Sequence, residues 1–199
     1  MTRTTFYKAQ YFATILGMGS IALLILIRYR FSAISILLTL FLLMVPGRIL
    51  GFYWRNLLRG LRLLNARQFE ESRRHSELFL EELRQRPYLK HFVWLGSSTY
   101  SRNPKVLALN NLGAAESGLG RFDAAKSHLE MAIDIDPKCP LPFFNMGIIH
   151  AKAGELEEAT RHFEEAARLG YTNSLSDKIV RGSQNRFART SGTGASGSI

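Results

Sequence analysis

Two consecutive stretches of this sequence read as copies of one another. Residues 109–137 are LNNLGAAESGLGRFDAAKSHLEMAIDIDP, and residues 143–171 are FFNMGIIHAKAGELEEATRHFEEAARLGY. A constant spacing of a few tens of residues is typical of proteins in which each unit stacks on the next. We therefore predict an all-α helical solenoid. A shift of 34 residues aligns seven identical pairs, namely Asn111/Asn145, Gly113/Gly147, Gly120/Gly154, Ala125/Ala159, His128/His162, Glu130/Glu164 and Ala132/Ala166.

Each copy has the pattern of two antiparallel helices in close contact. Gly113 and Ala125 allow the two backbones to approach, and Gly120 provides a short turn between the helices. Asp136-Pro137 ends the second helix, because the residue before a proline disfavours the helical conformation. The second copy repeats this arrangement with Gly147, Ala159 and Gly154.

The spacing of these residues resembles the tetratricopeptide repeat (TPR). Glu116 and His150 stand where that family usually has an aromatic residue, and Tyr171 stands where a closing proline is common. The resemblance covers residues 106–172, and it implies a non-enzymatic domain that binds other proteins. It is carried by Leu109-x-x-Leu112-Gly113 with Ala125, Leu129, Ala132 and Pro137, and by Phe143-x-x-Met146-Gly147 with Ala159, Phe163 and Ala166.

A weaker third copy precedes these two. At a shift of 53 residues, Phe69 aligns with Phe122 and His75 aligns with His128. We interpret residues 87–105 as an insertion that holds a short ordered element, helix or strand, and a polar loop. The TPR-like domain then spans residues 65–189, with about three repeats and a capping helix over 173–189. Residues 190–199, TSGTGASGSI, have the composition of a disordered tail.

The first third of the chain has a different composition. Residues 9–27 and 31–47 contain no charged residue, and Arg28-Tyr29-Arg30 separates them. A helix that crosses a bilayer needs about 20 apolar residues. A cleaved signal peptide would need a small-residue cleavage site before Arg28, and the sequence has none there. Two buried helices of a soluble protein would show polar faces, and these two stretches show none. We therefore predict a transmembrane helical hairpin over residues 1–47.

Residues 48–64 predict a basic amphipathic helix at the membrane surface, although their second half could also begin the repeat domain. The membrane-surface residues are Arg48, Phe52, Tyr53, Trp54, Arg55, Arg59 and Arg62. Six basic residues flank one side of the hairpin, and two, Arg28 and Arg30, flank the other. The positive-inside rule then predicts an integral membrane protein with its TPR domain on the cytoplasmic side.

The charge distribution excludes several classes of function. Residues 1–64 carry eight basic residues and no acidic residue, because the first acidic residue is Glu70. The remainder carries 18 basic against 16 acidic residues. The excess charge belongs to the apolar third, so we expect no nucleic-acid partner. A single cysteine, Cys139, excludes an intramolecular disulfide and a cysteine-based zinc site. Signatures of nucleotide loops, serine hydrolases and zinc proteases are missing. We expect no catalytic residue, metal, cofactor or small-molecule substrate.

The remaining functional candidate is a surface that binds protein. The predicted groove lies on the first helix of each repeat and comprises Leu107, Asn110, Ala114, Ser117, Leu141, Phe144, Ile148, Ala151 and Lys152. It suits an amphipathic helix or an extended apolar segment, unless the insertion or the capping helix fills it. Aromatic residues of the insertion form a second candidate interface, unless they pack locally: Tyr88, Phe92, Trp94 and Tyr100.

These observations predict a membrane-anchored adaptor or scaffold that helps to assemble or organise a membrane complex. The alternative is a permanent accessory subunit of a multi-subunit membrane complex, held by its hairpin. Small residues along the first span would permit close helix contacts in that case: Ala13, Gly17, Gly19, Ser20 and Ala22.

Overall fold

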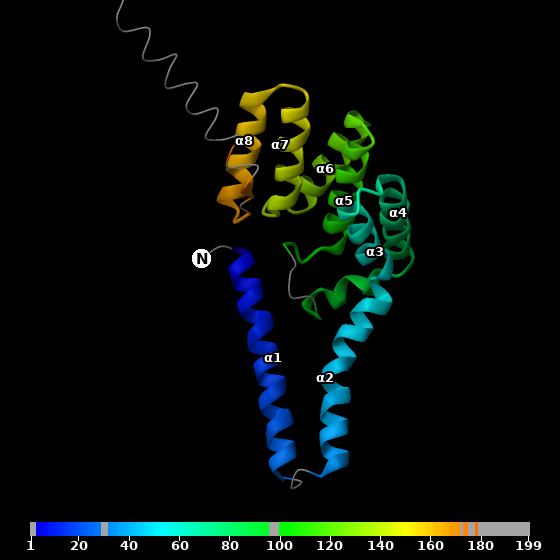
Figure 1. The fold of residues 1–199 in the computed structure, drawn as a ribbon, viewed down its shortest axis with the longest axis vertical. Helices are drawn as coiled ribbons and strands as arrows, with labels where there is room; N and C mark the ends of the chain where they lie inside the picture. Colours follow the sequence, from blue (N-terminus) through cyan, green and yellow to red (C-terminus); the bar gives the residue numbers. More distant parts are fainter. Residues whose placement is uncertain (1–2, 29–31, 96–99, 172, 175–177, 179–199) are drawn as a thin grey trace, which may run out of the picture.

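The computed structural model describes residues 3–28, 32–95, 100–171, 173–174 and 178, and within them every regular element is helical (Figure 1). This confirms the predicted all-α class. In chain order the elements are α1 (Arg3–Arg28), α2 (Ala33–Tyr53), α3 (Arg55–Asn65), α4 (Phe69–Gln85), the 3-10 helix η1 (Pro87–Leu95), α5 (Pro104–Gly118), α6 (Phe122–Ile135), α7 (Pro140–Lys152) and α8 (Leu156–Arg168).

Helices α1 and α2 form an antiparallel hairpin that projects from the other helices (Figure 1). Its large apolar side chains are exposed, as shown by Leu16, Leu37 and Phe41 at 70%, 66% and 70%. In the described part of the chain, one helix is long and apolar enough to cross a membrane, Ala9–Arg28. Only 6% of its most apolar stretch is buried. The second predicted span forms most of α2.

The predicted helix over residues 48–64 is divided in two. Helix α2 continues to Tyr53, Trp54 interrupts it, and α3 begins at Arg55. Helix α3 packs against α4, so the first helical pair begins at Arg55, within the predicted segment 48–64. The alternative in which the second half of this segment begins the repeat domain therefore agrees with the structure.

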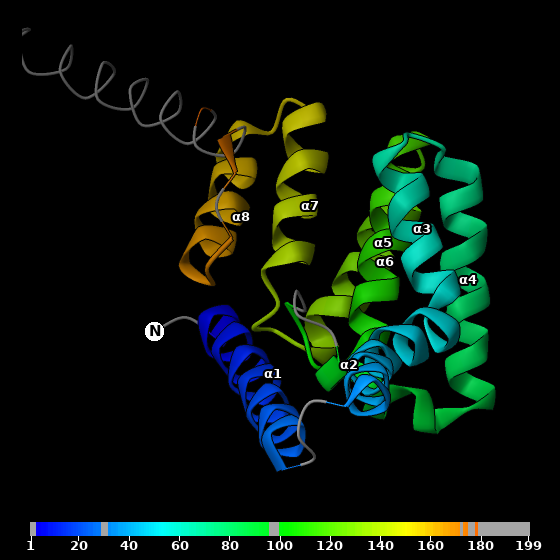
Figure 2. The same ribbon diagram turned by 60° about the horizontal axis from the view of Figure 1, so that its bottom comes forward.

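Three helical pairs, α3/α4, α5/α6 and α7/α8, stack in sequence (Figure 2). Gly60, Gly113 and Gly147 lie at equivalent positions, where the first helix of each pair approaches the second. A Cβ atom built on Gly113 would lie 2.7 Å from Cγ of Leu129, and one on Gly147 would lie 2.7 Å from Cδ1 of Phe163. We call α3, α5 and α7 the A helices, and α4, α6 and α8 the B helices.

The turn inside each pair has the same geometry. Gly120 and Gly154 have φ angles of 77° and 81°, and Arg67 takes the equivalent position in the first pair with φ of 59°. The backbone N–H that follows bonds back to the A helix in all three pairs, at 2.9 Å in each case. This shared turn fixes the register of the pairs.

The insertion contains the 3-10 helix η1, which resolves the choice between helix and strand. Leu89 of η1 is 2% exposed, and its carbonyl accepts a hydrogen bond of 3.2 Å from the indole Nε1 of Trp54. The predicted capping helix over 173–189 falls outside the described residues except for 173–174 and 178, and the predicted tail over 190–199 falls outside them entirely.

Candidate functional site

The A helices place equivalent apolar residues side by side. Helix α3 contacts α5, and α5 contacts α7. Gly60, Gly113 and Gly147 are followed by Leu61, Ala114 and Ile148, and we call these last three the apolar row. Leu61 is 43% exposed, whereas Ala114 and Ile148 are partly buried. The next equivalent positions, one turn further along, are Leu64, Ser117 and Ala151.

Polar residues of the predicted groove join one repeat to the next. Asn110 and Ser117 are each 5% exposed. The amide of Asn145 donates to Oδ1 of Asn110 at 2.8 Å, which bridges α5 and α7. Lys152 donates to the backbone oxygen of Ser117 at 3.1 Å and lies 5.8 Å from the ring centre of Phe122. These side chains stabilise the stack, so the surface open to a partner is smaller than the sequence predicted.

The chain itself covers one end of the predicted groove. Phe144 is 9% exposed, and its ring centre lies 4.8 Å from that of Tyr171 and 5.5 Å from that of Phe163. Tyr171 also contacts Tyr100 at 5.6 Å. Phe144 is therefore a core residue here. Leu107 and Leu141 are likewise partly buried against core clusters.

The second candidate interface is divided between two parts of the molecule. Tyr88 is 49% exposed and makes an edge contact with Tyr53 of the hairpin at 6.2 Å. Tyr100 packs on Tyr171, after the third repeat. The side chains of Phe92 and Trp94 lie outside the described residues.

The predicted membrane-surface residues separate into exposed and buried positions. Phe52 is 66% exposed, Tyr53 is partly buried, and the side chains of Arg48, Arg55, Arg59 and Arg62 are exposed. Trp54 differs from the prediction, because it is 2% exposed and packs with Leu57, Phe79 and Ala108. It occupies the core because the break between α2 and α3 turns its indole toward α4 and η1.

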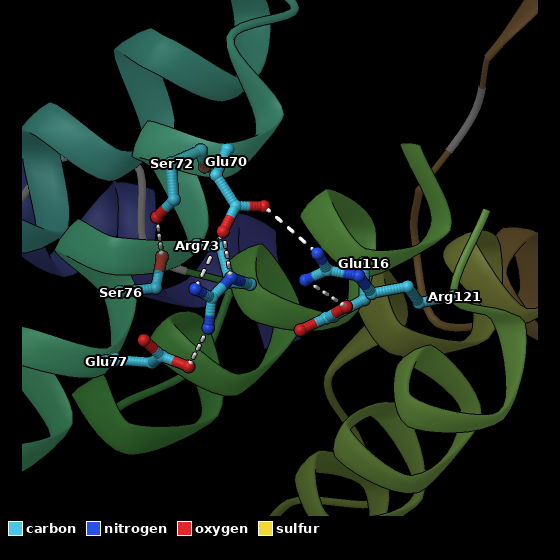
Figure 3. Close-up of polar contacts among 7 residues, drawn as sticks. All are labelled: Glu70, Ser72, Arg73, Ser76, Glu77, Glu116 and Arg121. Atoms are coloured by element: carbon cyan, nitrogen blue, oxygen red, sulfur yellow. Dashed lines mark hydrogen bonds and ion pairs between the residues drawn. The ribbon is translucent and has the colours of Figure 1, made fainter. Parts of the chain in front are cut away.

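A polar seam that the sequence did not reveal joins the first two repeats (Figure 3). Arg73 of α4 contacts Glu70 at 2.8 Å and Glu77 at 2.5 Å. Arg121 then reaches Glu70 at 3.5 Å and Glu116 at 3.6 Å. The hydrogen bond from Arg73 lowers the pKa of Glu70. Glu116, 5% exposed, thus sits between repeats at the position where the TPR family usually has an aromatic residue.

A second departure from the TPR pattern, His150, lies in the third repeat. The ring of His150 stacks on that of His162 at a centroid distance of 5.1 Å, and His150 also contacts the carboxylate of Glu155. Burial lowers the pKa of His162, and the neighbouring His150 lowers it further. His150 therefore replaces the usual aromatic residue in packing. In the described part of the chain, no group of three or more His, Cys, Asp or Glu residues could hold a metal ion.

Helices α5 and α6 form the second of the three helical pairs. Residues 106–135 match the family model of the tetratricopeptide repeat. No curated protein matches the chain. The family match supports the predicted resemblance for this helical pair. Tetratricopeptide repeats are typically non-enzymatic protein-interaction modules. The neighbouring pairs share the glycine contacts and the turn geometry of this pair.

Proposed function

We propose that this protein is a membrane-anchored adaptor whose repeats bind another protein. The observation that carries this proposal is the direct attachment of an exposed apolar hairpin to a TPR domain. The candidate span Ala9–Arg28 is 6% buried, so nearly all of its apolar surface needs another environment. A bilayer supplies that environment, because it requires a helix of about this length and apolar composition.

The basic residues around the hairpin support one orientation. Arg3, Lys8 and Arg48 flank its open end together with three arginines of α3, whereas Arg28 and Arg30 flank the closed end. The positive-inside rule places the side with more basic residues in the cytoplasm. The repeats would then face cytoplasmic partners, and a protease added outside intact cells would leave residues 65–199 whole.

The anchor can be tested by alkaline extraction of native membranes. A protein held by a transmembrane hairpin stays in the pellet, whereas a protein held by surface charge is released. Release of the full chain into the supernatant would contradict membrane anchoring.

The apolar row is the surface that we propose for the protein partner. Leu61 is its most exposed member, and Ala114 and Ile148 occupy the equivalent positions of α5 and α7. Apolar positions repeated across stacked helices suit the apolar face of an amphipathic helix. Anchoring in a membrane plane also raises the effective concentration toward partners in that membrane, which favours a role in assembling or organising a membrane complex.

The partner site can be tested by photo-crosslinking in native membranes. A photoreactive amino acid at Leu61 is expected to give one discrete adduct with another protein. Leu78 of α4 is a matched control, because it is 44% exposed against 43% for Leu61 and lies on a B helix. Equal crosslinking from both positions, or none from Leu61, would place the interface elsewhere.

A permanent accessory subunit of a membrane complex is the second candidate function. A Cβ atom built on Gly17 or Gly19 of α1 would meet nothing within 4 Å. Another membrane helix could therefore approach α1 closely at either glycine. Stoichiometric co-purification of partners through the hairpin in mild detergent would favour the subunit. Loss of partners with the hairpin intact would favour the adaptor.

A further inference from the structure

Four exposed basic residues gather beside the hairpin, and we call them the basic edge. They are Arg86 after α4, Lys90 in η1, and Arg102 and Lys105 at the start of α5. Residues 86–95 and 100–105 contain these four basic residues and no aspartate or glutamate. Figure 1 shows the segments that carry them at the end of the repeat domain nearest the hairpin.

Several arginines of the repeat domain pair with glutamates of the same helix, as in Arg84–Glu81 at 2.9 Å and Arg168–Glu165 at 2.5 Å. Arg86, Lys90 and Lys105, in contrast, form no ion pair with a carboxylate among the described residues. Their charges are therefore available for an external anion.

Contacts with the hairpin fix the height of the basic edge. The guanidinium of Arg102 donates to the side chain of Gln10, which is the second residue of the candidate span Ala9–Arg28. Next to Lys90, the carbonyl of Leu89 accepts the indole N–H of Trp54, the residue that directly follows α2. If α1 crosses the bilayer, both contacts hold the basic edge at the level of the lipid headgroups.

We propose that the basic edge binds the headgroups of anionic phospholipids in the bilayer that holds the hairpin. This inference rests on the membrane anchoring proposed above. Phosphate-bearing headgroups match the exposed guanidinium and ammonium groups, and each Lys or Arg at an anionic surface strengthens binding by about fivefold. The repeats are then docked on the membrane, and the basic edge faces the bilayer.

The test uses the full chain in nanodiscs of phosphatidylcholine alone or with phosphatidylglycerol. Hydrogen–deuterium exchange reports the amides of 86–95 and 100–105. We expect exchange at least threefold slower with phosphatidylglycerol. A triple variant, Arg86→Gln, Lys90→Gln and Lys105→Gln, is expected to lose this difference, and so is the wild type in about 1 M salt, where the Debye length is about 3 Å. Inorganic phosphate added to phosphatidylcholine nanodiscs is expected to leave exchange unchanged.

A control triple variant removes the same charge from the opposite end of the repeats, with Arg67→Gln, Arg74→Gln and Lys126→Gln. It is expected to keep the protection. Equal exchange in both nanodiscs, protection that survives in the edge variant, protection lost in the control, or protection by free phosphate would overturn the lipid proposal. A chain that fails to enter nanodiscs of either composition would overturn the anchoring itself, so the two failures are distinguishable.

Discussion

The contact between Gly147 and Phe163 makes the packing of the third repeat testable with one methyl group. A Cβ atom on Gly147 would lie 2.7 Å from both Cδ1 and Cε1 of Phe163 and 3.0 Å from its Cζ. The ring has no room to retreat, because Phe163 is 1% exposed and packs with Phe144. Gly147→Ala should therefore destabilise the repeats, although alanine favours a helix.

Two opposing effects set the size of the change. Replacing a helical glycine by alanine stabilises by about 1 kcal/mol. Overpacking a filled core costs about 1–3 kcal/mol, and a Cβ atom only 2.7 Å from the carbons of a buried ring belongs near the upper end of that range. The net loss is then about 2 kcal/mol, which lowers the melting temperature of a domain of this size by roughly 8 °C.

The assay is thermal unfolding of the full chain in nanodiscs, followed by helical circular dichroism. Gly51→Ala is the matched control, since a Cβ atom there meets nothing within 4 Å. It is expected to melt at or slightly above the wild-type temperature. Adding Phe163→Leu to Gly147→Ala should recover part of the loss, because the smaller side chain vacates the overlap. A Gly147→Ala protein that melts at or above the wild type would refute the close approach of α7 to α8.

Three further predictions concern buried side chains. Trp54→Ala should cost about 3–5 kcal/mol in the free energy of unfolding, measured with denaturant, because it removes a core indole and its bond to η1. Phe144→Glu should reduce the helicity of α7 and α8, since it buries a charge against Phe163 and Tyr171; intact helicity would contradict this packing. Burial lowers the pKa of His162 in the folded protein. As the pH falls, this histidine is therefore protonated in the unfolded chain, at about pH 6.5, before it is protonated in the folded protein. Stability should therefore fall as pH drops through this value toward the folded pKa, less steeply in His162→Gln, as measured by melting between pH 7.5 and about 5.

The repeat architecture could be predicted because few residue types allow two helix backbones to approach closely. Gly113 and Gly147 are needed where a Cβ atom would overlap a buried side chain, so their spacing records the period of the stack. The same argument reaches Gly60, which lies 53 residues before Gly113 and packs against Ser76. That glycine was the available signal that α3 belongs to the repeats.

The start of the repeats is difficult to place from sequence because two environments share one composition. Phe52-Tyr53-Trp54 followed by spaced arginines describes a helix at a membrane surface and also a hairpin that enters a protein core. The structure separates them, because Phe52 is 66% exposed whereas Trp54 is 2% exposed. A break of the helix at one residue decides which side each ring faces, and composition does not encode that break.

The extent of the groove depended on contacts between residues far apart in the chain. The ring of Tyr171 packs on the ring of Phe144, and the amide of Asn145 donates a hydrogen bond to Asn110 of the preceding repeat. Helical periodicity places these side chains on the A-helix face but does not say which of them meet each other. The residues that remain partly open, Leu61, Ala114 and Ile148, are fixed by the register of the glycines.

The junction at Trp54 links the two halves of the proposed function. Helices α2 and α3 are separated by this single residue, and Trp54 is held by Phe79 of α4 and by the Leu89 carbonyl of η1. Tyr88 of η1 contacts Tyr53 on the other side of the break. The hairpin therefore enters the repeat core without a flexible linker. In a membrane, the direction of α2 would then set the direction of the A helices, so Leu61 and the rest of the apolar row would meet a partner at a fixed height above the bilayer.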